Sequence, residues 1–333
     1  DDLISELQQV KIRTSVRDKI GLNLKTESES FMAEYTRRKE GKSFKIWKSK
    51  FPTINEAIGG YLSGNLYTFY GRSGRGKSVI VMEEALEAAM QGARVLVWAM
   101  EMSEFEWVAR AYSSLSARQG IFDAKIEGVN YDVGFDNKAM LTGKLSEEFE
   151  KALAVFLPTL NEMIPGEIIL RATDHADFHE RNLKQLEEDI RQTKADFVVV
   201  DAFYHLDYEK NTSRTTGGDA ANTSMKLKRL AGYTQATIAA VTQAEELKGG
   251  GKDDEGNREL SLPERNEAKK TSALLEDATN LIAIDSLDGI ALVGINKGRN
   301  GGEGTVAELL YMPNFGLVKE IETGQAAASQ FNF

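Results

Sequence analysis

The chain has 333 residues, which is enough for one large α/β domain or two smaller ones. Its content of 41% hydrophobic and 28% charged residues is ordinary for a soluble globular protein. The absence of cysteine excludes disulfides and thiolate metal sites, and three histidines leave little for a zinc site. A formal net charge of −10 argues against a surface that is basic all over, so any contact with nucleic acid must be local.

The N-terminal region, residues 1–48, is rich in charge and contains a basic patch that begins at Arg37. Near its start, apolar residues recur at helical spacing: Leu3, Ile4, Leu7 and Val10. Two interpretations stand equal. The region is a solvated leader, or it forms an amphipathic helix too small to stand alone, whose apolar stripe docks on another subunit. We predict one large domain at 49–323 and a flexible tail at 324–333.

The stretch from Leu66 to Gln91 carries the strongest motif of the sequence. An apolar and aromatic run at 66–70 predicts a buried strand, and helix formers at 78–91, closed by Gly92, predict a helix. The residues between them fit the phosphate-binding pattern of a glycine, four free residues and Gly-Lys-Ser. The residues of this loop, all predicted to bind nucleotide, are Gly71, Arg72, Ser73, Gly74, Arg75, Gly76, Lys77 and Ser78.

A strand, a glycine-rich loop and a helix in this order place backbone N–H groups and the positive end of a helix dipole around a di- or triphosphate. Lys77 would then reach the β and γ phosphates, and the Ser78 hydroxyl would hold Mg²⁺. The alternative is a glycine-rich turn that matches the pattern by chance, and the flanking strand and helix argue against it.

A second strand is predicted at 94–100, where a nearly continuous apolar run indicates burial on both faces of a parallel sheet. It ends at Glu101, at the carboxyl edge where open α/β sheets bind ligands. Ser103 and Glu106 fit a capping box that begins a helix, and this helix carries Arg110, a further candidate for nucleotide binding. Taken alone, Glu101 could equally be an exposed carboxylate at a strand end.

Two further strands are predicted to end in polar groups. Four apolar residues precede Asp201, which is the pattern of a second Mg²⁺ carboxylate and is informative downstream of a phosphate loop. The strand at 237–241 leads to Gln243, for which an ordinary polar cap is the alternative. The segments 209–219 and 245–272 are predicted loops, and the second is too long to be a mere connection.

The C-terminal part predicts antiparallel strands at 281–284, 290–295, 306–311 and 317–321. A glycine-rich hairpin turn at 296–304 carries Lys297 and Arg299, for which a solvated turn is the alternative. We expect helices at 145–157, 180–194 and 220–233, a strand at 167–170, and irregular structure at 119–145. The predicted fold class is α/β, with a central, mostly parallel sheet flanked by helices and with C-terminal antiparallel strands.

Five elements now stand in order: the phosphate loop, Glu101 in WAMEMS, Asp201 in FVVVDAFYHL, Gln243 in AAVTQ, and Lys297 and Arg299 in NKGRNG. Their order and spacing closely resemble the C-terminal motor domain of DnaB-type replicative DNA helicases, which belong to the RecA-like P-loop ATPases. The resemblance covers roughly residues 50–322, and KGRNGGEG is its most specific piece. It implies a RecA-like ATPase core at 49–323.

The resemblance also implies catalytic roles. Lys77 and Ser78 would bind the phosphates and Mg²⁺, and Asp201 would support the metal. Glu101 would polarise the attacking water, and Gln243 would sense the γ phosphate and connect it to DNA loops. Phosphoryl transfer needs charge neutralisation and a positioned water rather than a covalent nucleophile, which agrees with these residue types.

In the same family, cations at the positions of Lys297 and Arg299 would reach the phosphates of the neighbouring subunit. Such an arrangement implies a ring, and a homo-hexamer is the expected form. The implied activity is ATP hydrolysis that drives translocation 5′ to 3′ on single-stranded DNA and duplex unwinding in DNA replication. A primase or a helicase loader is a candidate partner.

No apolar run reaches the length of a membrane span, and the first residues do not resemble a signal peptide. We therefore expect no membrane partner and a cytoplasmic location, in a bacterium or in a phage-infected host cell. The family's N-terminal helical domain is not part of this sequence, which suggests a motor fragment or a compact, phage-encoded variant.

The DNA contacts are where the chain departs from the family. Glu245 and Glu246 stand where a basic residue is usual, and the Arg-Glu-Ser-Gly run of the second DNA loop has no clear equivalent. Lys269 and Lys270, or Arg265, are the rival candidates for DNA binding. Two other functions stay open: an oligomeric ATPase of the RecA or KaiC type without unwinding activity, and a nucleotide-gated loader or scaffold.

Overall fold

The computed structural model of the chain describes residues 23–126, 128–212, 217–245, 258–267, 272–299 and 301–321. The chain divides into two units, Asp1–Lys45 and Ile46–Phe333. The boundaries predicted at residues 48 and 323 stay predictions, and the predicted tail lies outside the described residues. No helix in the described ranges is long and apolar enough to cross a membrane.

The first unit contains helix α2 (Ser28–Lys39), which has an acidic residue in its first turn and three basic residues in its last turn. Each charge therefore opposes the partial charge at its end of the helix dipole. Phe31, Met32 and Tyr35 of this helix are more than half exposed. The apolar stripe predicted at residues 3–10 lies outside the described residues, so its docking on another subunit stays a prediction.

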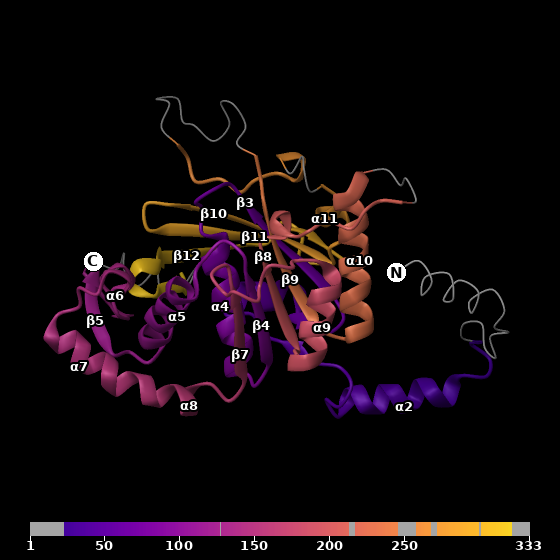
Figure 1. Cartoon of the computed structure of the whole chain (residues 1–333), viewed down its shortest axis with the longest axis horizontal. Coiled ribbons are helices and arrows are strands. Elements are labelled where there is room, and N and C mark those ends of the chain that lie inside the picture. Colours follow the sequence, from indigo (N-terminus) through magenta and orange to yellow (C-terminus); the bar gives the residue numbers. More distant parts are fainter. Residues whose placement is uncertain are drawn as a thin grey trace, which may run out of the picture. The chain divides into compact units, whose positions relative to one another are not determined.

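The described part of the second unit is built around a nine-stranded sheet (Figure 1). Its strands are β3 (Leu66–Gly71), β4 (Arg94–Ala99), β7 (Glu167–Ala172), β8 (Phe197–Asp201), β9 (Thr237–Gln243), β10 (Asn280–Leu287), β11 (Ile290–Gly298), β12 (Val306–Met312) and β13 (Leu317–Glu320). Their order is β13-β12-β11-β10-β3-β9-β8-β4-β7. The run from β10 to β7 is parallel, whereas β11, β12 and β13 pair antiparallel at one side, which confirms the predicted fold class.

Helices cover both faces of this sheet (Figure 1). The main ones are α3 (Pro52–Ile58), α4 (Lys77–Met90), α5 (Glu104–Arg118), α9 (Leu183–Thr193), α10 (Gly218–Thr234) and α11 (Ser272–Asp277). The residues of β8 alternate between the two faces: Val199 packs with α4, whereas Val198 and Val200 pack with Leu186 of α9 and Leu227 of α10. A strand with two covered faces has no solvent side, so its sequence reads as a continuous apolar run.

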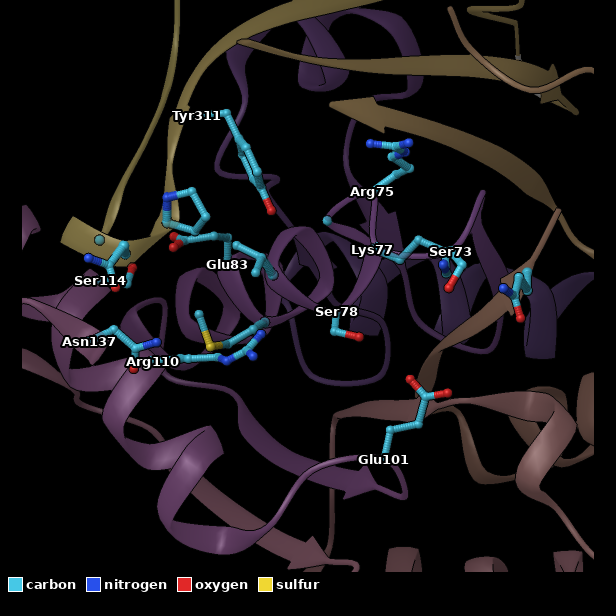
Figure 2. Close-up of a pocket in the computed structure, with 18 of the residues that line it drawn as sticks. Ser73, Arg75, Lys77, Ser78, Glu83, Glu101, Arg110, Ser114, Asn137 and Tyr311 are labelled. Carbon is cyan, nitrogen blue, oxygen red and sulfur yellow. The ribbon is translucent and has the colours of Figure 1, made fainter. Parts of the chain in front are cut away.

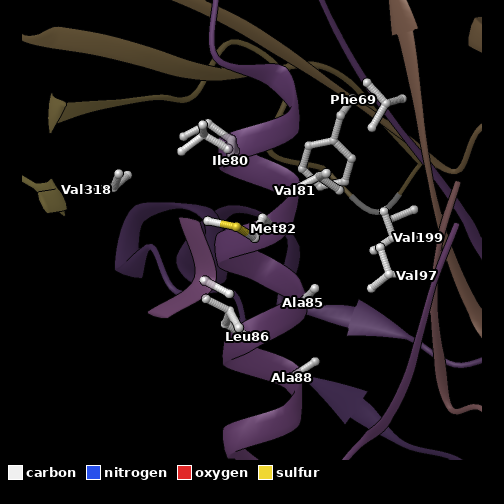
Figure 3. Close-up of a cluster of buried hydrophobic side chains, with 14 of the residues drawn as sticks. Phe69, Ile80, Val81, Met82, Ala85, Leu86, Ala88, Val97, Val199 and Val318 are labelled. Carbon is white, nitrogen blue, oxygen red and sulfur yellow. The ribbon is translucent and has the colours of Figure 1, made fainter. Parts of the chain in front are cut away.

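Helix α4, which follows the phosphate loop, packs tightly on the sheet. Figure 3 shows Val81 and Ala85 turned towards Phe69, Val97 and Val199 of the strands. All five side chains are essentially inaccessible to solvent. The small alanine lets the helix approach the strands closely, so the start of α4 is held firmly at the end of β3.

The predicted helix boundaries follow the capping residues. Ser103 accepts a hydrogen bond from the backbone N–H of Glu106 (3.3 Å), which confirms the predicted cap of α5. Asn182 accepts one from Gln185 N–H (2.9 Å), so α9 begins at residue 183 rather than at 180. Gly92 follows α4 with a φ of +93°, the left-handed conformation expected of a glycine after a helix.

The expectation that residues 119–145 are irregular is wrong. This stretch forms the antiparallel pair β5 (Phe122–Ile126) and β6 (Val129–Val133), followed by α6 (Asn137–Thr142). The strands are short and half exposed, so their apolar residues give only a weak alternation. Asp136 caps α6 by accepting a hydrogen bond from Ala139 N–H (2.8 Å).

The smaller elements connect these layers. They are β1 (Ile46–Trp47), β2 (Tyr61–Leu62), α7 (Glu147–Phe156), α8 (Leu160–Met163), and the short 3-10 helices η1 (Leu157–Thr159), η2 (Phe203–His205), η3 (Arg265–Glu267) and η4 (Pro313–Phe315). The turns η2 and η4 follow directly on β8 and β12. They therefore project at the ends of strands, where a ligand can be reached.

A buried ionic cluster anchors the segment that follows β1 to α4. Lys50 Nζ and Arg118 Nη2 both contact Glu83 Oε2, at 2.5 and 2.7 Å, and Ser49 Oγ donates to Glu84 Oε1 at 2.7 Å. Burial raises the pKa of Glu84 to about 7. These groups fix the face of α4 that continues into the cavity described below.

Two glycines should respond to alanine in opposite ways. A Cβ on Gly166, just before β7, would meet the carbonyl oxygens of Ala93 and Ala89, so Gly166→Ala should destabilise the fold by about 1–3 kcal/mol. Gly232 is exposed on α10 with open space around it, so Gly232→Ala should add up to about 1 kcal/mol through helix propensity. Chemical denaturation measures both, and a loss of similar size in the two variants would contradict this account.

Candidate nucleotide site

The carboxyl ends of four parallel strands bring the predicted catalytic groups to one edge of the sheet. Gly71 at the end of β3 pairs with Gln243 at the end of β9, and Ala99 of β4 pairs with Asp201 at the end of β8. The N–H of Met100 donates to the carbonyl of Asp201 at 2.7 Å. Glu101 therefore follows directly beside Asp201, although the two residues are far apart in the sequence.

The phosphate loop turns tightly between β3 and α4. Gly74 and Gly76 have φ values of +68° and +89°, which only glycine adopts without strain. A Cβ on Gly76 would also collide with the hydroxyl of Tyr311, which lies over the loop. The loop thus requires glycine at this position for its backbone and for the close approach of a distant strand.

Lys77, the first residue of α4, is 8% exposed and folds back on its own loop. Its Nζ donates to the carbonyl oxygen of Arg72 at 2.9 Å. Burial lowers the pKa of Lys77, while the nearby carboxylates of Asp201 and Glu101 act in the opposite direction. An anion at the loop would therefore receive an ammonium group that is already close at hand.

The loop opens into a cavity of about 610 Å³ (Figure 2). Its predicted lining residues are Ser73, Gly74, Arg75, Gly76, Lys77, Ser78, Glu101, Arg110 and Gln243. Figure 2 shows Lys77, Ser78 and Glu101 at one end, with Arg110, Glu83 and Tyr311 towards the other. One hollow therefore receives side chains from the loop, α4, α5 and the ends of β4 and β9.

Asp201 lies buried next to this cavity, with 3% of its surface exposed. Burial raises its pKa to about 6, against a hydrogen bond from Ser78 that lowers it. Its Oδ1 atom is buried and has no hydrogen-bond partner within the described chain. A buried, unpaired carboxylate oxygen beside a hydroxyl is chemically suited to a hard divalent cation such as Mg²⁺.

Glu101 is held by two residues that sequence reasoning missed. Tyr204 donates a hydrogen bond from its hydroxyl to Glu101 Oε1, and His205 Nε2 lies 3.3 Å from the same oxygen. Burial and the adjacent carboxylate raise the pKa of Tyr204, so it stays a hydrogen-bond donor. Both residues belong to η2, directly after Asp201, so their place beyond a strand tip was the available signal.

The far end of the cavity combines an aromatic ring, amides and a guanidinium. Tyr311 and Asn314 come from β12 and η4, and Asn137 comes from α6. Arg110 pairs with Glu106 at 2.6 Å, and its buried Nε has no partner among the described residues. No motif marks Tyr311, Asn314 or Asn137, because the fold alone brings these segments to the loop.

Two members of the predicted loop do not line the cavity. Gly71 is the last residue of β3, where a Cβ would press on the carbonyl of Ile284. The guanidinium of Arg72 points elsewhere and forms two hydrogen bonds of 3.0 Å with Glu267. A role of Arg72 in nucleotide binding is thus confined to its backbone and stays a prediction.

The cations of the predicted hairpin lie apart from this cavity. Arg299 is exposed and follows the end of β11. Lys297 Nζ donates to the carbonyls of Leu275 and Glu276, at 3.1 and 2.6 Å, and so caps the last turn of α11. Burial, and then the charge of Arg299, lower the pKa of Lys297. The two residues do not line the cavity of their own chain.

The DNA-binding candidates have different standings. Lys269 and Lys270 lie outside the described residues, as do 213–216 and 246–257 of the two predicted loops. The guanidinium of Arg265 donates from Nε to the carbonyl of Asn296 at 2.7 Å and pairs with Glu303 at 2.6 Å. These contacts occupy much of its donor capacity within the protein.

Comparison with known proteins agrees with this geometry. The ATPase domain of a phage helicase superposes with a TM-score of 0.65 at 18% identity, covering 89% of this chain and 99% of that chain. A DnaB-like replicative helicase, described together with its interactions with primase, gives 0.63 at 17% identity and covers 96% of this chain and 71% of that chain. These likenesses confirm, at the level of the fold, the resemblance to DnaB-type motor domains.

No curated protein sequence matches the chain. The AAA domain family AAA_25 matches it over residues 37–247, which is more than half of the 333 residues and includes the phosphate loop, Glu101, Asp201 and Gln243. The chain therefore belongs to this family of AAA domains.

Proposed function

We propose that the chain is the motor of a ring-forming replicative DNA helicase, which hydrolyses ATP while it moves 5′ to 3′ on single-stranded DNA and unwinds duplex. The observation that carries the proposal is the single cavity lined by the phosphate loop, Glu101 and Gln243, with Asp201 buried beside it. The fold shared with a DnaB-like replicative helicase supports this choice among RecA-like ATPases.

Nucleotide binding would use groups that are already in place. Lys77 would exchange the carbonyl of Arg72 for the β and γ phosphates, and the N-terminus of α4 would direct backbone N–H groups and its dipole at them. The ring of Tyr311 and the amides of Asn137 and Asn314 would receive the base and ribose at the far end.

The residues present fit a Mg²⁺ ion, because Ser78 and the unpaired Oδ1 of Asp201 offer hard oxygen atoms beside the phosphate loop. When bound, the ion would neutralise charge on the β and γ phosphate oxygens. Glu101 would orient the attacking water, and the hydrogen bond from Tyr204 would fix the direction of this carboxylate. Gln243, at the end of β9, would sense the γ phosphate.

Assembly would complete the site. Arg299 is exposed and lies outside its own cavity, which supports the proposal that it reaches the phosphates of a neighbouring subunit in a homo-hexamer. Lys297 would assist there only after it leaves the α11 carbonyls, or would hold the hairpin in position. Single-stranded DNA, bound by Lys269, Lys270 or Arg265, and a primase or loader are the proposed partners.

Asp201 should make stability depend on pH. Its folded pKa of about 6 lies above the ordinary value, so its charge costs stability as the pH rises through 6, and the cost is absent well below that pH. Asp201→Asn should therefore raise the melting temperature of ligand-free protein at pH 8, equivalent to on the order of 2 kcal/mol, with a smaller gain at pH 5. It should also abolish Mg²⁺-dependent nucleotide binding. An equal gain at both pH values would count against this role.

Hydrolysis with and without single-stranded DNA, together with strand displacement, tests the function. Lys77→Ala should lose most nucleotide binding, whereas Glu101→Ala should bind nucleotide and lose roughly 10²-fold or more in turnover, because Glu101 acts on water only as the transition state forms. Glu104→Ala, exposed nearby, is the matched control. Hydrolysis without strand displacement would favour a RecA- or KaiC-like ATPase, and no turnover would favour a loader or scaffold.

Arg299→Ala should bind nucleotide and assemble, yet turn over roughly 10³-fold or more slowly, because the guanidinium stabilises charge on the transferring phosphoryl group. Arg299→Lys should recover little, since lysine lacks the fork. Mixing Arg299→Ala with Glu101→Ala subunits should restore part of the rate, because some sites then combine an intact Glu101 with an intact Arg299 from a neighbour. Rings of proven mixed composition that stay inactive would place Arg299 in its own subunit's chemistry.

A further inference from the structure

We propose that the buried ion pair between Arg72 and Glu267 is a positioning contact that couples the phosphate loop to the segment 258–267, and that through it single-stranded DNA changes the rate of hydrolysis. The inference rests on the proposed function, because it assigns a route by which the two ligands of that function affect each other. Neither residue touches the reacting atoms.

The pair has a directional geometry. Arg72 Nε and Nη2 each lie 3.0 Å from an oxygen of Glu267, and Nη1 donates to the carbonyl of Ser261 at 2.8 Å. The two charged side chains are 11% and 2% exposed. A two-pronged contact of this kind fixes both the distance and the orientation of its partners, and burial keeps salt from screening it.

On one side, the pair is connected to the nucleotide site. The carbonyl oxygen of Arg72 accepts the hydrogen bond of Lys77 Nζ at 2.9 Å. A phosphate that takes up this ammonium group removes the donor from that carbonyl. The peptide of Arg72 therefore senses whether Lys77 faces the loop or the phosphate, and its guanidinium passes any shift to Glu267.

On the other side, Glu267 stands at the base of the loop predicted to bind DNA. Glu245 N–H donates to the carbonyl of Glu267 at 2.9 Å, and Ala244 N–H donates to Gly71 at 3.0 Å. Residues 245 and 267 thus close the base of this loop directly beside the phosphate loop. In the sequence, the next residues after Glu267 lead to the candidate DNA contacts Lys269 and Lys270, which lie outside the described residues.

The same segment also reaches the hairpin that carries Arg299. Arg265 contacts the carbonyl of Asn296, and Asn296 Nδ2 donates to the hydroxyl of Tyr70 on β3 at 2.6 Å and to the carbonyl of Pro263 at 2.9 Å. A movement of η3 would therefore be felt at the phosphate loop and at the turn that faces a neighbour. The segment has contacts suited to transmission in both directions.

Stability alone is a weak reason for such a pair. The cost of removing both charges from water offsets most of their attraction, so apolar side chains of the same size would stabilise the fold equally well. What the pair adds is a defined orientation between two segments that meet different ligands. A coupling of this kind must be reciprocal: if DNA changes nucleotide affinity, nucleotide changes DNA affinity by the same factor.

The test compares wild type with Glu267→Gln in two measurements. The first is the ratio of ATP hydrolysis with and without an oligo-dT strand, and the second is oligo-dT affinity with and without a non-hydrolysable ATP analogue. Glu267→Gln should keep basal turnover and its KM for ATP within about twofold of wild type. Both ratios should fall at least about fivefold, because the amide keeps the shape of the side chain but not its charge.

Two further variants sharpen the result. Glu264→Gln removes an exposed carboxylate three residues earlier and should leave both ratios unchanged. Glu267→Asp keeps the charge but shortens the side chain, so both ratios should lie between wild type and Glu267→Gln. If Glu267→Gln does not fold, Glu267→Asp decides the question by the same two ratios.

Two outcomes would overturn the proposal: unchanged ratios in the folded variant, or basal and DNA-stimulated rates that fall by the same factor, as a purely structural role predicts. Failure of the proposed function looks different. A wild-type protein whose hydrolysis ignores single-stranded DNA would contradict the helicase itself, whereas stimulated wild type with stimulated Glu267→Gln would contradict only the coupling.

Discussion

The parallel pairing of β3, β9, β8 and β4 is the constraint on which the site depends. Parallel strands end at the same edge, so Gln243, Asp201 and Glu101 meet the phosphate loop without any contact that is local in sequence. Helices cover both faces of these strands, which leaves their ends as the place where polar side chains can appear. The burial that stabilises the sheet therefore also concentrates its chemistry at one edge.

The cost of this arrangement is buried charge. Asp201 keeps an oxygen without a partner in the described part of the chain, Lys77 rests on a carbonyl of its own loop, and Glu83 on α4 is held by Lys50 and Arg118. An isolated buried charge is unfavourable, so a phosphate and a cation would relieve groups that the fold leaves unsatisfied. Ligand binding and fold stability are consequently linked through the same few side chains.

Much of this could be predicted from the sequence, for physical reasons. Continuous apolar runs identified β4 and β8 because both faces are covered, and the Gly-Lys-Ser loop identified the site because its backbone geometry demands those residues. The half-exposed strands β5 and β6 gave too weak an alternation to be recognised. Tyr311 could not be found, since only tertiary folding brings β12 over Gly76. The side chain of Arg72, inside the motif, turned out to serve another segment.

The position of Tyr311 and Asn314 has a consequence for how the chain is divided by evolution or by experiment. Every motif of the phosphate-binding half lies before residue 244, yet the far wall of the cavity is supplied by β12 and η4 near the other end of the chain. A shortened protein that stopped after the parallel strands would keep each recognisable signature and still lack the surface that encloses the ligand. Possession of the motifs is thus a poor guide to whether a fragment holds a nucleotide, and the antiparallel strands belong to the site as fully as the loop does.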